Sequence, residues 1–187
     1  MNKLLLTLCA GVIVLKVHAS STEPVVTTLL VKPQRVELID PDTKTRHFRT
    51  RFVVVNERLE PAIRLEHATH NSLGYTLQGN IASGGLSINR LQRIRTEQEI
   101  QGTQLTVKHW VQVRRIPGKE AALIRGYNYQ QSHTLSLPKH VQGIRIEALE
   151  IRTPDASNAE PRMLAEIHLD WPLKRPLSAP SEAPESP

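Results

Sequence analysis

Strict alternation of apolar and polar residues is the feature that most constrains this chain. In the stretch RHFRTRFVVV, residues 46–55, the side chains of Phe48, Phe52 and Val54 fall on one face of an extended chain. The other face carries a basic stripe, which consists of His47, Arg49 and Arg51. Because successive side chains of a strand point to opposite faces of a sheet, a period of two predicts β-structure. The same signal predicts strands at 25–31, 34–39, 62–69, 74–81, 106–114, 143–152 and 162–171.

Turn residues between these segments predict how the strands pair. DPDTK at 40–44 joins residues 34–39 and 46–55 into a hairpin. Residues 143–152 change phase between Ala148 and Leu149, which predicts a bulge, and this strand is expected to pair with 162–171. A further hairpin is expected across 106–130, around Pro117 and Gly118.

One segment breaks the alternation. In SINRLQRIRTEQEIQG, residues 87–102, the apolar residues Ile88, Leu91 and Ile94 are three apart and Gly102 follows the end. This spacing favours an amphipathic helix over 89–99. The fold class expected from the whole pattern is mainly β: an antiparallel β-sandwich-like domain of about nine strands with one short helix.

Both ends of the chain are expected to lie outside this domain. Residues 1–19 combine Lys3, an apolar run and a small residue at Ala19, which predicts a cleaved signal peptide and export to the periplasm or beyond. Residues 172–187 are rich in Pro, Ser and Glu, which predicts a disordered tail. The globular domain then spans 20–171, with no membrane span after signal cleavage.

Cleavage would leave a chain without thiols, because Cys9 is the only cysteine. Disulfides, a cysteine nucleophile and thiolate metal sites are then excluded. Loss of Lys3 and Lys16 leaves 22 Lys and Arg against 18 Asp and Glu, a formal net charge of +4. That excess is compatible with an anionic partner or with simple solubility. For an exported chain, we expect an envelope glycan or protein partner and no nucleic acid.

The expected hairpin across 106–130 gives the main candidate binding face. It sets Trp110 opposite Arg125 and Lys108 opposite Tyr127, with Tyr129 beyond, so that aromatic and cationic side chains interleave. The alternative is that a second layer covers this face and Trp110 anchors a core. His109, on the apolar phase opposite Gly126, is expected to be a core histidine.

The basic stripe and a histidine cluster are the other candidate sites. The stripe is either a solvated strand face opposite Glu37 or an anionic contact surface. Glu66, His67 and His70 are a weak metal candidate, because i and i+3 point to opposite faces of a strand unless the chain turns between them. Glu147, Glu150, Glu166 and Asp170 are expected on solvated strand faces.

These features favour a non-catalytic exported module that binds or assembles in a bacterial cell envelope, with no cofactor. A metal- or carboxylate-dependent hydrolase using Glu66, His67 and His70 is the first alternative. The second is a subunit of an envelope secretion or conjugation complex, in which exposed strand edges pair with partners.

Overall fold

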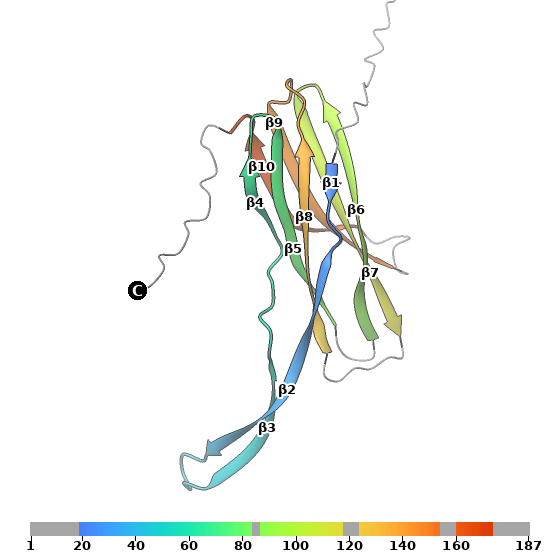
Figure 1. Ribbon diagram of the computed structural model, residues 1–187. Coiled ribbons are helices and arrows are strands. Elements are labelled where there is room, and N and C mark those ends of the chain that lie inside the picture. Colours follow the sequence, from blue (N-terminus) through green and yellow to red (C-terminus); the bar gives the residue numbers. More distant parts are fainter. Residues whose placement is uncertain (1–18, 84–86, 118–123, 154–159, 174–187) are drawn as a thin grey trace, which may run out of the picture.

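The computed structural model describes residues 19–83, 87–117, 124–153 and 160–173, and this part of the chain is mainly β, with strands and no helix. The ten strands are β1 (Ala19–Ser21), β2 (Val25–Ile39), β3 (Arg46–Val54), β4 (Ala62–Ala68), β5 (Ser72–Ala82), β6 (Ser87–Gln101), β7 (Gln104–Pro117), β8 (Ile124–Ser136), β9 (Gly143–Thr153) and β10 (Arg162–Asp170). They form two sheets (Figure 1).

The first sheet has six strands in the order β3-β2-β8-β5-β4, with β1 paired to β8 beside β2. All of its pairings are antiparallel. The second sheet has four strands in the order β10-β9-β7-β6. Its β7–β9 pair is parallel, because the chain crosses to the first sheet through β8 between these two strands.

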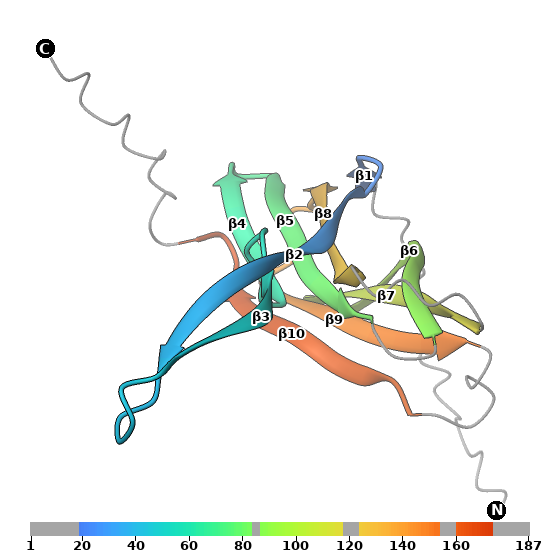
Figure 2. The same cartoon turned by 90° about the horizontal axis from the view of Figure 1, so that it is seen from below.

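One hydrophobic core lies between the sheets, whose strands cross one another in Figure 2. Alternate residues of β5 and β8 face alternate residues of β7 and β9 across it. The buried residues include Leu73, Tyr75, Leu77, Tyr129 and Leu135 from the first sheet and Leu105, Val107, Val111, Ile144 and Ile146 from the second. Trp171 closes the core after β10.

The helix expected over 89–99 is wrong, since these residues belong to strand β6. A register shift between Leu91 and Arg93 lets two residues of β6 oppose one residue of β7. The bulge brings Leu91 and Ile94, three residues apart, onto the same face. From Ile94 onward the ordinary alternation resumes toward the core, with Thr96 and Ile100 half-buried.

The hairpin expected across 106–130 is also wrong, because β7 and β8 lie in different sheets. Trp110 pairs with Arg95 and Leu149, not with Arg125. β7 instead forms its hairpin with β6 through the tight turn at Gly102, where φ is +62°. Two strands that face each other across a core show the same alternation as two strands paired side by side, so the pattern alone does not distinguish them. The turn itself, residues 118–123, lies outside the described residues.

The other expected pairings are confirmed. Residues 34–39 and 46–54 form the β2–β3 hairpin. β9 pairs with β10, and the irregularity between Met163 and Ala165 lies opposite Ala148 and Leu149, where the phase change predicted it. Of the ends, residues 1–18 and 174–187 are outside the described part, so the signal peptide and the tail stay predictions.

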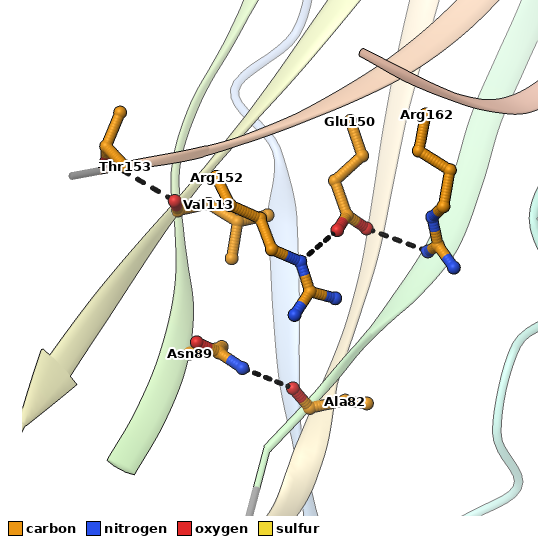
Figure 3. Close-up of polar contacts among 7 residues, drawn as sticks. All are labelled: Ala82, Asn89, Val113, Glu150, Arg152, Thr153 and Arg162. Carbon is orange, nitrogen blue, oxygen red and sulfur yellow. Dashed lines mark hydrogen bonds and ion pairs between the residues drawn. The ribbon is translucent and has the colours of Figure 1, made fainter. Parts of the chain in front are cut away.

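Two carboxylates expected at solvated positions are instead buried. Glu147 and Glu150 are each 5% exposed. The Glu150 carboxylate accepts from Arg152 Nε at 2.5 Å and from Arg162 at 3.0 Å (Figure 3). Glu147 pairs with Arg145 at 2.7 Å. Arginines of the same strand, and Arg162 of the adjacent strand β10, therefore replace the water that an isolated carboxylate would require. Figure 3 also shows Asn89 of β6 donating to the carbonyl of Ala82 in β5, which ties the two sheets at one end.

A polar cluster lies inside the core, where Tyr75 and His133 of the first sheet meet His109 of the second. His109 is fully buried, as expected, but its neighbours differ from the expected Gly126. The Tyr75 hydroxyl lies 2.7 Å from His109 Nε2, and His109 Nδ1 lies 3.0 Å from Thr96 Oγ1. With the ring proton on Nδ1, Tyr75 donates to His109 and His109 donates to Thr96. The His133 ring stacks on Tyr75 at 5.2 Å between ring centroids.

Burial keeps both histidines neutral. Desolvation, followed by the proximity of His133, lowers the pKa of His109 to about 3. Desolvation lowers the pKa of His133 to about 4. In the unfolded chain both rings take up a proton near the ordinary pKa of 6.5. Stability from this cluster is therefore present above pH 6.5 and is lost as the pH falls through about 4 for His133 and about 3 for His109.

We predict that replacing His133 with Phe makes the unfolding free energy less dependent on pH between 6.5 and 4. The Phe ring keeps the stacking on Tyr75. Unlike His133, it cannot take up a proton when the chain unfolds. Each such proton contributes a slope of about 1.4 kcal/mol per pH unit. Urea unfolding at a series of pH values measures this slope, with the exposed His140→Gln as the control variant. An unchanged slope in His133→Phe would contradict the assignment.

Candidate functional site

The β2–β3 hairpin extends beyond the body of the protein as a two-stranded arm, residues 31–54 (Figure 1). Its first strand begins in the first sheet, where Val25–Leu30 pairs with β8. From Val31 to Ile39 the same strand pairs with β3 alone. The strands expected at 25–31 and 34–39 form the single strand β2, with Pro33 inside it. A strand with a neighbour on one side only can lack an N–H on its open side.

The tip of the arm is fixed by Asp40. The amides of Asp42 and Thr43 donate to its carboxylate at 2.9 and 3.0 Å, and Lys44 adopts a left-handed φ of 55°. These backbone donors, Thr43 first, lower the pKa of Asp40. The DPDTK turn predicted from the sequence is therefore confirmed, and it closes the β2–β3 hairpin.

One face of the arm is an exposed apolar surface. Both phenylalanines of the protein, Phe48 and Phe52, lie on it and are 57% and 52% exposed. Val54, Pro33 and Ile39 share this face through the register of the two strands. Arg35 covers one side of the Phe48 ring at 3.8 Å from the ring centroid. A soluble domain rarely keeps its largest apolar side chains on a projecting ribbon unless they contact a partner.

The opposite face of the arm carries the basic stripe. His47, Arg49 and Arg51 pair across the hairpin with Leu38, Val36 and Gln34, in that order. The expected neighbour Glu37 lies on the other face, opposite Phe48, and pairs with Arg46 at 3.3 Å. Within the described residues, Arg49 and Arg51 have no acidic partner within ion-pair distance.

A groove of about 560 Å³ follows this basic face to the base of the arm. Arg125 of β8 lines it together with Arg49 and Arg51, Val36 and Leu38 supply apolar walls, and Thr50 and Phe52 of β3 complete the lining. Three guanidinium groups from two strands therefore line one concave surface. Guanidinium groups bind carboxylates and phosphates through parallel N–H donors, so an anionic group suits this groove.

A β-bulge positions Arg125. Leu29 pairs with Gly126 and Leu30 with Ile124, so Arg125 has no paired residue on β2. Gly126 adopts a φ of +151°, and a Cβ on it would approach the carbonyl oxygen of Ile81 to 2.5 Å. Only glycine fits this close approach, which is why the bulge forms here and releases Arg125 from the ordinary alternation.

The residues expected to form an aromatic-basic binding face are not brought together. Lys108 and Trp110 lie half-buried on the outer side of the second sheet, where Trp110 Nε1 donates to Glu97 at 2.6 Å. Tyr127 and Tyr129 are buried in the first sheet. Only Arg125 lies in a candidate site, where it lines the groove with Arg49 and Arg51 of the basic stripe. The sequence signal that could have indicated this is the adjacent Arg125-Gly126 pair at the start of a strand.

The weak metal candidates do not converge either. A bulge between Leu65 and His67 places the His67 ring over Gly74, where a Cβ would collide with it. Glu66 instead hydrogen-bonds with Thr76. Among the residues that the structure describes, no three His, Cys, Asp or Glu side chains are grouped closely enough to hold a metal ion. Glu66 and Thr76 line another groove, of about 690 Å³, together with Arg64, Gln78, Gln130 and Ser132.

No described segment forms a helix long and apolar enough to cross a membrane. No protein-family model, curated protein or solved structure matches this chain.

We predict that Gly126→Ala lowers the unfolding free energy by about 1–3 kcal/mol and loosens the base of the arm, because the bulge cannot hold a Cβ against Ile81. Hydrogen exchange of the amides in Val26–Leu30 measures the local effect. Gly102→Ala is the matched control, since Gly102 also has a positive φ but meets nothing within 4 Å. Faster exchange in both variants would contradict the local role of Gly126.

Proposed function

We propose that this protein is a non-catalytic assembly module of a bacterial cell envelope, a β-sandwich that docks on a partner protein through the β2–β3 arm. The single observation that carries the proposal is the exposure of both phenylalanines on one face of the projecting arm. The predicted signal peptide supports an exported location, periplasmic or secreted, and the thiol-free mature chain is compatible with it.

The arm has the two properties of a docking element. Its apolar face offers aromatic anchors that gain about 1.5–3 kcal/mol each when buried. β3 is an edge strand of the first sheet. The backbone N–H and C=O groups on its outer side therefore have no strand partner within the described residues. A partner strand could bury the apolar face and also hydrogen-bond with the open backbone groups of β3. A protein can do both, which favours a protein partner over a glycan.

The arm also supports one of the alternatives. A subunit of a secretion or conjugation complex is an assembly module whose partners are other subunits, and a projecting hairpin with an open edge suits such a chain. The hydrolase alternative receives no comparable support, because Glu66, His67 and His70 do not surround a common point in the described structure.

We predict that the double variant Phe48→Ser, Phe52→Ser loses its partner while the body stays folded. Both side chains are exposed, so their removal leaves the core intact. Loss of each anchor should weaken binding by about tenfold or more. Cross-linking in intact cells, followed by affinity purification of the tagged full-length chain, measures partner recovery.

The matched control is Val25→Ser, Met163→Ser, which removes exposed apolar side chains away from the arm. Circular dichroism and the unfolding midpoint establish that both variants fold. Equal partner recovery from the arm variant and the wild-type chain would overturn the docking role of the arm.

A further inference from the structure

The arm concentrates the positive charge of the protein. Residues 31–54 contain six Lys and Arg against three Asp and Glu, a formal net charge of +3, which is half of the +6 of the whole chain. On the apolar face, Glu37 pairs with Arg46, and Arg35 stacks on Phe48. The groove face is different, because Arg49, Arg51 and Arg125 have no acidic partner among the described residues. Apart from the charge of Arg35, the unbalanced charge of the two strands therefore lies on the groove face.

This charge pattern opposes pairing between two copies of β3. An antiparallel pair of β3 strands would bring the basic stripes of both copies onto the same face as cross-strand neighbours. Like charges opposite one another destabilise a strand pair, and charged residues on an edge strand are a common defence against self-association. A second copy of this chain is thus disfavoured, and the same charges favour a strand of opposite sign.

We propose that the arm binds an extended protein segment in which acidic and apolar residues alternate, and that this segment adds as a further strand to the open edge of β3. This inference rests on the proposed function, because it names the chemistry of the partner that docks on the arm. Acidic side chains of the segment pair with Arg49 and Arg51 on the groove face. Its apolar side chains lie beside Phe48 and Phe52 on the opposite face.

The geometry requires this alternation. Arg49 and Arg51 are two residues apart on one face, while Phe48, Thr50 and Phe52 alternate with them on the other. An added strand has the same period of two, so its acidic residues must also be two apart. Backbone hydrogen bonds to the edge supply affinity that does not depend on sequence, and the two faces supply specificity. An acidic membrane surface would match the arginines but would not use the backbone edge.

The test compares the binding of three synthetic peptides, each as long as β3, to the full-length protein. In the first peptide Glu alternates with Val. The second has the same composition, but its Glu residues are in one block and its Val residues in another. The third alternates Lys with Val. Fluorescence anisotropy measures affinity, and hydrogen exchange of the Arg46–Val54 amides reports strand addition.

We expect the alternating Glu peptide to bind the wild-type chain at least about tenfold more tightly than either other peptide, and to protect the β3 amides. The variant Arg49→Glu, Arg51→Glu should reverse the preference and bind the alternating Lys peptide. The control variant Arg114→Glu, Arg115→Glu makes the same change in charge on exposed residues of β7, away from the arm, and should keep the wild-type preference.

Three results would each overturn the inference: equal binding of the alternating and block peptides, unprotected β3 amides, or a preference that the charge reversal leaves unchanged. The groove would instead be assigned to lipid if the wild-type chain sediments with phosphatidylglycerol vesicles, the variant Arg49→Glu, Arg51→Glu does not, and the wild-type chain shows no preference among the peptides. If the peptides fail while the phenylalanine variant still loses its partner, the assembly function stands and only the partner chemistry is wrong.

Discussion

The backbone ladder between β2 and β8 is the interaction on which the arm depends. A two-stranded ribbon is marginally stable in water by itself. Here its first strand continues from the first sheet, where Leu29 is fully buried, and Val31, the first residue of the arm, is still only 4% exposed. The 15 residues of β2 therefore belong to the body at one end and to the arm at the other. Because the strand is continuous, the direction of the arm is set by the twist of the first sheet and does not require a partner.

The body holds this ladder rigid through contacts that cross between the sheets. Tyr75 and His109 come from opposite sheets, and their hydrogen bond requires one relative placement of β5 and β7. A buried polar pair that can be satisfied in only one arrangement gives the core a defined register, as well as the cohesion of the surrounding apolar side chains. The same burial makes the core sensitive to acid, since neither histidine can be charged without losing its environment.

The local pattern predicted most of the strands, because apolar and polar side chains alternate along them. In β7 the alternation separates a buried face from a half-buried one, whereas in β3 both faces are exposed. It also predicted the β2–β3 hairpin and the separation of Phe48 and Phe52 from the basic stripe, because alternation and the DPDTK turn act within a short stretch. It failed in β6, where the spacing of Leu91 and Ile94 is produced by a bulge as readily as by a helical turn. Bulges depend on the partner strand, which a local pattern does not contain.

The candidate site was only partly predictable for a related reason. Arg125 was placed with Trp110 because the sequence offered a hairpin between consecutive strands, yet β7 and β8 are separated by the whole thickness of the core. The bulge at Gly126 that brings Arg125 beside Arg49 and Arg51 arises from pairing with β2, nearly a hundred residues earlier in the chain. Contacts over such a separation depend on topology, which the alternation of single strands does not specify.

The composition of the arm is consistent with an edge strand that stays open to a partner but does not pair with the same strand of a second copy. A long edge strand with aromatic and β-branched residues is a hazard, because its backbone groups can template another strand. The arm has this property through Phe48, Phe52 and Val54, but every second residue from His47 to Arg51 is basic. The basic stripe on one face and the two phenylalanines on the other leave few strands that fit both. If the arm docks as proposed, the apolar residues that would make it prone to aggregation also make it selective, because the basic stripe restricts which strands can pair with it.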